Sequence, residues 1–220
     1  MLFRSARLFA TPFVNDTESS LRGLGFGLAT TKGDISSLIS GYKTPGQANN
    51  FFAYKTGTAP NTTTANGEQD RLSPQAYYYN GPFGLLYEYA RVNQPIKFGN
   101  STASIENSAW QLAGSWLMTG EDASFRGVKP YSRFQSGAEG GWGAFEVVAR
   151  YQENQIDETI PSAFTDGRYA LKAGAIAVGL NWYLNESSKF AVNYERTRLS
   201  GGTLDGKSEN FLVGRYQLSF

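Results

Sequence analysis

The sequence predicts an all-β protein whose antiparallel strands form the wall of a transmembrane β-barrel. Segments in which apolar and polar residues alternate recur along the chain, separated by glycine-rich and polar stretches. The 220 residues include 15 Phe, 13 Tyr and 4 Trp, yet the mean hydropathy is -0.38. This combination suits a wall that averages lipid-facing and water-facing residues. No apolar stretch approaches the ~18 residues of a membrane helix.

The first third of the chain contains three short predicted strands: Leu2–Phe9, Arg22–Thr30 and Asn50–Lys55. In Arg22–Thr30 glycine occupies every second position and therefore one face of a strand, whereas a phosphate-cradling glycine loop must open a helix. Asp34–Asn50 is irregular and contains the turn signal Pro45-Gly46. Gly57–Glu68 is poor in residues that pack, which predicts a mobile surface loop.

The middle of the chain contains the clearest hairpin. Arg71–Tyr79 and Pro82–Gln94 flank Asn80-Gly81, the preferred dipeptide of a two-residue type I′ turn. A further strand is predicted at Ile105–Thr119, where Trp110, Leu112 and Trp116 share a face opposite small and polar residues.

The last third contains four further predicted strands: Trp142–Gln152, Arg168–Leu184, Lys189–Leu199 and Glu209–Phe220. Several exceed the ~5–6 residues usual in soluble sheets. The faces opposite the apolar ones carry Gly, Ala, Ser, Asn, Gln and a few charges, as a water-filled lumen requires. These patterns predict about ten strands.

The C-terminal strand has one apolar face, formed by Leu212, Gly214, Tyr216, Leu218 and Phe220. Chain ends usually fray because they have little to bury. This strand ends on an aromatic residue and resembles the last strand of outer-membrane barrels, which closes the barrel and is read by the assembly machinery. An edge strand of a soluble sheet is the alternative.

Alternate connections should be short if the C-terminus is periplasmic. The short Asn80-Gly81 and Asn185–Ser187 then lie on the periplasmic side. The longer connections on the outer side are Gly57–Glu68, Ile156–Gly167 and Ser200–Ser208. Two connections break the rule because they are long: Asp34–Asn50 and Gly120–Gly140.

The composition excludes several function classes. Without His there is no Ser-His or Cys-His pair and no imidazole metal site, and without Cys there is no disulfide or thiolate site. We expect no cofactor and no enzyme. A net charge of +1 gives no bulk attraction to nucleic acid. The first residues, M-L-F-R-S-A-R-L-F-A, carry two arginines where a signal peptide has its apolar core, so no signal peptide is predicted.

Several segments resemble the phosphate-selective porin O and P family: F-A-T-P-F (Phe9–Phe13), L-R-G-L-G-F-G (Leu21–Gly27), R-L-S-P-Q-A-Y-Y-Y-N-G-P-F-G-L-L-Y-E-Y (Arg71–Tyr89), L-M-T-G-E (Leu117–Glu121), F-E-V-V-A-R-Y (Phe145–Tyr151), G-L-N-W-Y-L-N (Gly179–Asn185) and G-R-Y-Q-L-S-F (Gly214–Phe220). The resemblance implies a passive, water-filled porin for anions such as phosphate in the outer membrane of a Gram-negative bacterium. It also implies a homotrimer with roughly 16 strands per subunit.

The resemblance places this chain in the C-terminal half of such a porin. We therefore expect residues 1–220 to form a single porin domain, an incomplete barrel of about ten strands without the signal peptide and the first strands. A half-barrel leaves two open edges, which are costly in lipid. Much of the constriction, including the loop that folds into the pore, is expected in the other half.

Three cations are candidate lumenal anion contacts because they lie opposite the apolar faces of their strands: Arg150, Lys189 and Arg215. A guanidinium makes planar, bidentate contacts with phosphate and stays charged. Alternatively, each cation neutralises a lumenal carboxylate such as Glu146 or Glu195. The strand pattern leaves open which way three other arginines face: Arg4, Arg7 and Arg22.

Two other functions fit parts of the sequence. A soluble secreted β-sandwich that binds a ligand would share the strand pattern. An outer-membrane barrel hydrolase would need a paired carboxylate geometry, for which the candidates are Glu88, Glu146 and Glu195.

Overall fold

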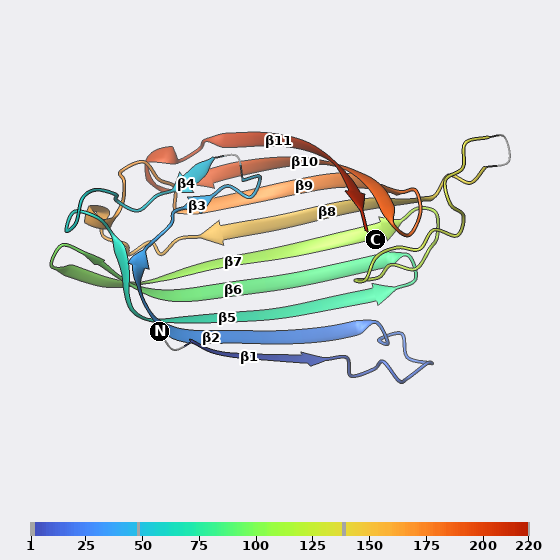
Figure 1. Ribbon diagram of the computed structural model, residues 1–220, viewed down its shortest axis with the longest axis horizontal. Helices are drawn as coiled ribbons and strands as arrows, with labels where there is room; N and C mark the ends of the chain where they lie inside the picture. The colour runs from blue at the N-terminus through green and yellow to red at the C-terminus, as the bar shows by residue number, and fades with distance from the viewer. Residues whose placement is uncertain (1–2, 48, 138–139, 220) are drawn as a thin grey trace.

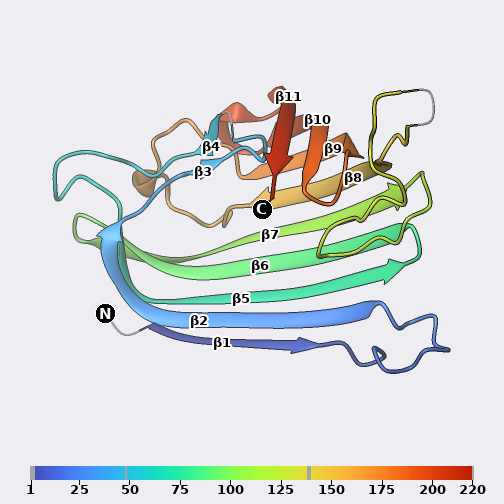
Figure 2. The ribbon, with the colours of Figure 1, turned by 45° about the vertical axis from the view of Figure 1, so that its right-hand side comes forward.

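A computed structural model describes residues 3–47, 49–137 and 140–219 as one strongly curved antiparallel sheet. Figures 1 and 2 show that the sheet forms an open trough. The predicted recognition of Phe220 by the assembly machinery falls on a residue outside the described part.

Nine strands form the trough, which we call the wall, and each pairs with the next in the order β1-β2-β5-β6-β7-β8-β9-β10-β11. Their bounds are β1 Phe3–Ala10, β2 Leu24–Leu38, β5 Thr64–Asn80, β6 Phe83–Phe98, β7 Ser101–Leu117, β8 Ala144–Gln155, β9 Lys172–Tyr183, β10 Ser188–Ser200 and β11 Ser208–Leu218. Two short 3-10 turns, Ser162–Phe164 and Gly202–Leu204, lie in the connections.

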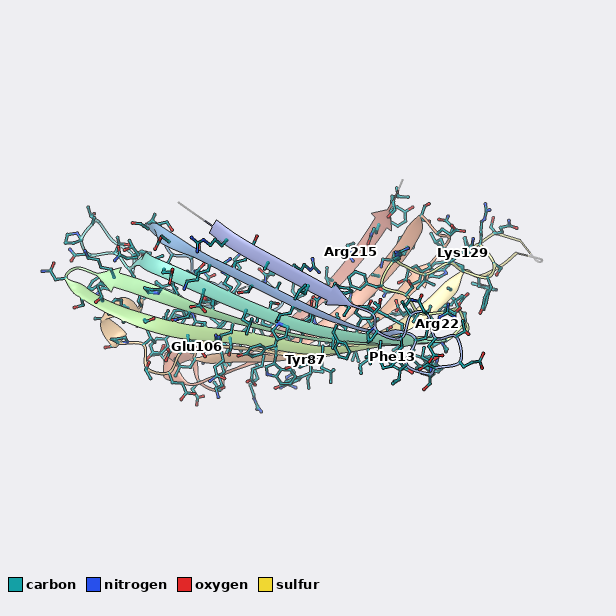
Figure 3. All side chains as sticks on the ribbon, turned by 90° about the horizontal axis from the view of Figure 1, so that it is seen from below. Phe13, Arg22, Tyr87, Glu106, Lys129 and Arg215 are labelled. Carbon is teal, nitrogen blue, oxygen red and sulfur yellow. The ribbon has the colours of Figure 1, made fainter. Side chains whose placement is uncertain are left out.

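The two faces of the wall differ as the alternation predicts. On β9 the convex face carries Ile176, 61% exposed, and Val178, 51% exposed, whereas the concave face carries buried Ala173 and Ala175. Figure 3 shows Tyr87 on the convex side and Arg215 on the opposite arm of the trough. Exposed apolar side chains on a continuous convex face are the arrangement expected for contact with lipid.

The described residues place no second sheet of comparable size against the wall, as a β-sandwich would require. The only other sheet in this part of the chain has two strands, β3 Tyr42–Lys43 and β4 Asn50–Phe52. None of the helices among the described residues has the length and apolar character needed to cross a membrane.

The glycines of β2 permit close side-chain packing over the concave face. A Cβ at Gly25 would lie 2.3 Å from the ring of Tyr77, and a Cβ at Gly27 would lie 2.6 Å from the amide of Gln75. The alternating glycines therefore make room for side chains of β5, as expected for a strand and not for a phosphate loop.

The β5–β6 hairpin differs by one residue from the prediction. Asn80 pairs with Phe83, so the two turn residues are Gly81 and Pro82, not Asn80 and Gly81. Gly81 has φ 52°. A type I′ turn needs positive φ at both central residues, which proline cannot adopt, whereas a type II′ turn needs it only at the first.

The prediction for the segment between β2 and β5 was wrong in two respects. Asn50–Lys55 is not a wall strand, because β4 pairs with β3 in a small hairpin. Gly57–Glu68 is not a mobile surface loop throughout, because Thr63 and Ala65 are buried and β5 begins at Thr64. The parts of Asp34–Asn50 and Gly57–Glu68 that lie between the end of β2 at Leu38 and the start of β5 at Thr64 thus belong to one connection. This removes Asp34–Asn50 as a separate exception to the sidedness rule.

The described part of the long connection Gly120–Gly140 packs on the end of the trough that carries the β5–β6 and β9–β10 turns. Ala123 and Val128 pack with Leu117, Ala144 and Tyr183. The Ala123 amide donates to the carbonyl oxygen of Gly81 at 2.7 Å, and the Phe134 amide donates to that of Leu184 at 2.7 Å. The connection is long because it packs back onto two neighbouring turns.

Candidate functional site

The concave face is crossed by the described part of the connection between β2 and β5, residues 39–47 and 49–63, which we call the inserted segment. Figures 1 and 2 show β3 and β4 on the concave side of the trough. Phe51 and Phe52 are fully buried there. They pack into a cluster with wall and loop residues that include Ile96, Ile105, Ile156, Phe164, Ala170, Ala173 and Leu199.

Backbone hydrogen bonds attach the inserted segment to the connection between β8 and β9. The Lys55 amide donates to the Phe164 carbonyl oxygen at 2.9 Å, and the Ala170 amide donates to the Phe51 carbonyl oxygen at 2.7 Å. Tyr54 forms an antiparallel bridge with Thr165. The segment is therefore held by a β-type contact as well as by its aromatic side chains.

Asn107 of β7 supports the same junction from the wall. Its side-chain amide donates to the Tyr42 hydroxyl at 2.9 Å and to the Tyr54 hydroxyl at 3.4 Å. Its carbonyl oxygen accepts from the Asp157 amide at 3.0 Å. Burial raises the pKa of Tyr54 well above its ordinary value because a phenolate would be desolvated there. The junction therefore keeps Tyr54 neutral.

Asp157 fixes the loop beside this junction. Partial burial pushes its pKa upward, but hydrogen bonds from Thr159 and from the Glu106 amide outweigh burial and leave the pKa below its ordinary value. The Glu106 amide donates to Asp157 Oδ2 at 2.8 Å. A carboxylate stabilised in this way holds the start of the β8–β9 connection against β7.

The tip of the inserted segment is fixed to the edge strand β11. Thr44 Oγ1 donates to Glu209 Oε1 at 2.9 Å, and the side-chain amide of Asn49 donates to Glu209 Oε2. A Cβ at Gly46 would lie 3.1 Å from Phe211, so the turn packs directly on that ring. Both carboxylate oxygens of Glu209 are thereby engaged, and the tip is held over the concave face.

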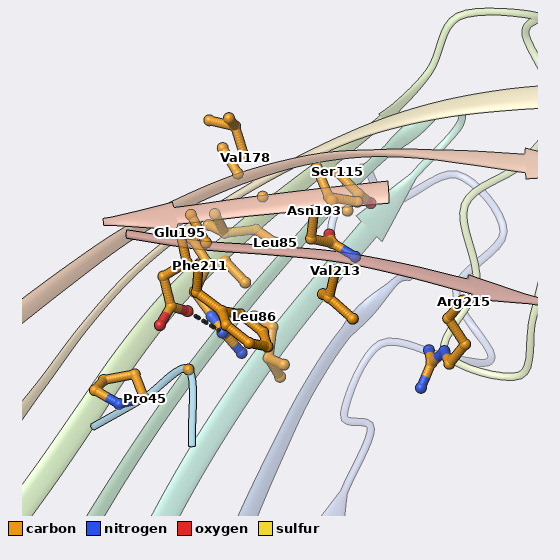
Figure 4. A pocket seen from close by; sticks show the side chains of 18 of the residues that line it. Pro45, Leu85, Leu86, Ser115, Val178, Asn193, Glu195, Phe211, Val213 and Arg215 are labelled. Atoms are coloured by element: carbon orange, nitrogen blue, oxygen red, sulfur yellow. Dashed lines mark hydrogen bonds and ion pairs between the residues drawn. The ribbon is translucent and has the colours of Figure 1, made fainter. Parts of the chain in front are cut away.

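Beside this tip lies a groove of ≈ 640 Å³ whose lining includes Pro45, Arg150, Glu195 and Arg215. Figure 4 shows Arg215 at one side of this groove, apart from Glu195. Arg150 Nη2 lies 2.9 Å from Glu195 Oε2, and Glu195 is 5% exposed. The structure thus brings two of the three predicted cations to one groove. Arg150 is ion-paired there, and Arg215 is exposed to the groove.

The Arg150–Glu195 pair spans a strand. Arg150 of β8 and Glu195 of β10 both face Ala177 of the intervening β9. The small alanine side chain leaves room for the guanidinium to reach across. Arg150 is therefore neutralised by a lumenal carboxylate, which was the alternative considered for all three cations.

Lys189 lies outside the lining of this groove. Its Nζ is 5.0 Å from the centre of the Tyr183 ring, an arrangement typical of a cation–π contact. The Tyr183 hydroxyl donates to Glu146 Oε2 at 2.8 Å, as does the Asn181 side-chain amide. Within the described part of the chain, neither Lys189 nor Arg215 forms an ion pair.

The structure assigns faces to the other arginines. Arg7 pairs with Ala29 on the concave side, and Arg4 pairs with Lys32 on the convex side. Arg22 lies in the β1–β2 connection, where its Nε donates to the Val14 carbonyl oxygen at 3.3 Å.

A cation that sequence reasoning missed is Arg71 of β5. It lines a second groove of ≈ 580 Å³ between the start of the inserted segment and β5–β8. The signal was present in the sequence, because Arg71 shares parity with Ser73, Gln75 and Tyr77, but no lumenal face had been assigned to that strand.

The three candidate carboxylates of a hydrolase are engaged by different partners. Glu88 accepts from the Gln111 side-chain amide, Glu146 from Asn181 and Tyr183, and Glu195 from Arg150. Acid–base catalysis at a glycosidic bond needs two carboxyl groups facing one reacting centre. The two grooves of the concave face instead include the exposed cations Arg71 and Arg215 in their linings.

The model of one family, phosphate-selective porin O and P, matches residues 43–220. None of the curated proteins with which the chain was compared matches it.

Proposed function

Because the chain belongs to the phosphate-selective porin O and P family, we propose that its concave face lines a passive, water-filled path for anions such as phosphate. The observation that carries this proposal is the unequal exposure of the two signs of charge. Arg215 is exposed to the groove, whereas Glu195 and Glu146 are 5% and 8% exposed and engaged by wall side chains. An anion in the groove therefore meets a cation more readily than a carboxylate.

The separation of these cations suits a conducting path better than a single high-affinity anion site. Arg215, Lys189 and Arg71 lie on different strands and line different parts of the concave face. Conduction requires binding strong enough for entry and weak enough for exit, which separated cations provide better than one cluster. Arg150 contributes less to the net field because Glu195 neutralises it.

The inserted segment supports the assignment of a constriction. It occupies the concave face from the Phe51–Phe52 anchor to the Glu209 contact, so part of the lumen's width is filled by backbone and aromatic side chains. A barrel wall with a segment folded into its lumen has a narrower path than the wall alone would give.

We propose that the wall forms part of a larger barrel. All neighbouring pairs in the wall are antiparallel, so the first and last of its nine strands, β1 and β11, run in the same direction. A closed antiparallel barrel needs an even number of strands. Closure therefore takes an odd number of additional strands between β11 and β1.

The family implies an outer-membrane location in a Gram-negative bacterium. We further propose a homotrimer, and recognition of the C-terminal strand by the outer-membrane assembly machinery. The mass of the detergent-solubilised complex tests the first proposal, and insertion of a variant in which Phe220 is replaced by Ala tests the second.

The test of the function is a planar-bilayer recording with the chain completed to a closed barrel by an odd number of further strands. From this completed barrel we expect discrete current steps and an anion-selective reversal potential across a KCl gradient, with a current reduced by added phosphate. Arg215→Gln should move the reversal potential toward zero and weaken the phosphate effect. Arg4→Gln is the matched control because Arg4 is on the convex face, and it should leave both readings unchanged.

Cation selectivity in the wild-type chain would overturn the proposal. An absence of discrete steps from the completed barrel would contradict a conducting path as well. Equal effects of Arg215→Gln and Arg4→Gln would contradict the role given to Arg215.

A further inference from the structure

The convex face of β10 changes from apolar to cationic along the strand. Val192 is 52% exposed and Tyr194 is 45% exposed, and the next two residues on this face, Arg196 and Arg198, are exposed as well. On β9 the apolar convex residues end with Ile176, and Lys172 follows nearer the end of the strand. Both strands therefore leave their apolar band at the same level.

Strand pairing brings these cations together. Arg196 pairs with Ile176, Arg198 with Gly174, and Ser200 with Lys172. We call Lys172, Arg196 and Arg198 the cationic patch. Gly174 leaves an opening within it, because the nearest atoms to a Cβ placed there are Tyr151 Oη at 3.4 Å and Glu153 Oε2 at 3.9 Å.

The two arginines of the cationic patch differ from Lys32 and Arg91 of the convex face in their ion pairing. Lys32 Nζ lies 2.8 Å from Glu68, and Arg91 lies 3.5 Å from Glu106. By contrast, neither Arg196 nor Arg198 forms an ion pair within the described residues.

Two acids lie near the cationic patch. Lys172 Nζ is 3.6 Å from Glu158, and Glu153 accepts from the Tyr151 hydroxyl at 3.4 Å. Neither acid forms an ion pair with an arginine of the patch. Two guanidinium groups therefore remain available to an anion from outside the protein.

We propose that the cationic patch binds the phosphate groups of an anionic glycolipid in the outer leaflet of the membrane. This inference rests on the proposed function only for placing the wall in that membrane. The patch lies at the end opposite the turns Gly81-Pro82 and Asn185–Ser187, which is the outer side if the C-terminus is periplasmic. Tyrosines at the edge of an apolar band mark the head-group level, and guanidinium groups bind phosphate bidentately.

A lipid fits this surface better than free phosphate does. Acyl chains attached to the bound head group would lie along the exposed apolar residues of the same strands, including Val178 and Val192. Such a ligand gains apolar burial in addition to charge attraction, whereas free phosphate gains only the latter, which salt screens at an exposed site.

The experiment measures lipid retained by the full chain in detergent, using native mass spectrometry. The probe is a bis-phosphorylated, acylated glucosamine disaccharide, and the comparison probe is the same lipid with both phosphates removed. We expect the wild-type chain to retain the phosphorylated lipid at least about tenfold better, since a difference of 1.4 kcal/mol already gives that ratio. Free phosphate at millimolar concentration should displace little of it.

The test variant is R196Q/R198Q, and the matched control is R126Q/R133Q, which removes the same charge from the connection at the opposite end. The test variant should lose the preference and the control should keep it. The single variant R198Q gives the same test if the double variant does not refold.

Equal loss in both variants, or equal retention of the two lipids by the wild-type chain, would overturn the proposal. Displacement by millimolar phosphate would show a free-anion site instead of a lipid site. Dimers or trimers of the wild-type chain that R196Q/R198Q abolishes would show that the patch is a subunit contact, which also overturns it. Because lipid retention is measured without current, failure of conduction and failure of lipid binding are distinguishable.

Discussion

Removal of the Phe52 side chain should release the inserted segment while leaving the wall intact. Phe52 is fully buried, its ring lies 5.0 Å from that of Tyr54 in an edge-to-face arrangement, and the Tyr169 ring lies 6.0 Å away. Truncation of a buried phenylalanine to alanine costs about 3–5 kcal/mol. Since these contacts attach the segment and not one wall strand to another, the cost falls mainly on docking of the segment.

The magnitude gives a measurable rate. Every 1.4 kcal/mol is a factor of ten in an equilibrium, so about 3 kcal/mol raises the undocked population roughly 100-fold. The Lys55 amide reports on docking because it donates to the Phe164 carbonyl oxygen at 2.9 Å. In Phe52→Ala, its hydrogen exchange should accelerate at least about 100-fold if exchange follows the open population.

The matched control is Phe125→Ala, because Phe125 is 74% exposed and belongs to the connection at the other end of the trough. It should leave exchange of the Lys55 amide unchanged. Two results would refute the reasoning: an exchange rate in Phe52→Ala within a few-fold of the wild type, or equal acceleration across β8 and β9. The second result would mean that Phe52 stabilises the wall itself.

Two further predictions concern the same segment. Glu209→Gln keeps one acceptor oxygen but removes the other and the charge, so it should weaken attachment of the tip by about 1.5–3 kcal/mol. Faster hydrogen exchange of the Gln47 amide and noisier current steps would show this weakening. An unchanged exchange rate of the Gln47 amide would contradict it. Burial raises the pKa of Tyr54, so the hydroxyl stays protonated while the inserted segment is docked. The free energy of docking is therefore constant below the ordinary tyrosine pKa of about 10 and becomes less favourable as the pH rises above it. An alkaline-stable protease should therefore cut the wild-type segment faster above about pH 10, whereas Tyr54→Phe should lose this dependence, and equal pH profiles would contradict the assignment.

Much of the wall could be predicted from the sequence because alternation is a local property. The pattern around Ile176 and Val178 identifies the lipid-facing side of β9, and the same parity places Arg150, Lys189 and Arg215 on the concave face. The prediction was least accurate at strand ends. The two-residue turn between Phe98 and Ser101 was not predicted, because neither flanking segment alternates clearly between apolar and polar residues.

The inserted segment could not be predicted in the same way. N-F-F-A-Y in Asn50–Tyr54 has the composition of a strand, and composition does not distinguish a wall strand from a segment that packs on the wall. The difference is set by partners more than a hundred residues away, Phe164 and Ala170, whose backbone groups pair with Lys55 and Phe51.

The sequence by itself determined the fold class and the side of the wall on which Arg150, Lys189 and Arg215 lie, because a strand's side chains alternate whatever its neighbours are. Only the tertiary structure decided which charges cancel. Arg150 is neutralised by Glu195 across Ala177, whereas Arg215, on the same face, forms no ion pair within the described residues. The physical reason is that an ion pair depends on a distance of a few ångströms between strands, which register and curvature set and local sequence does not.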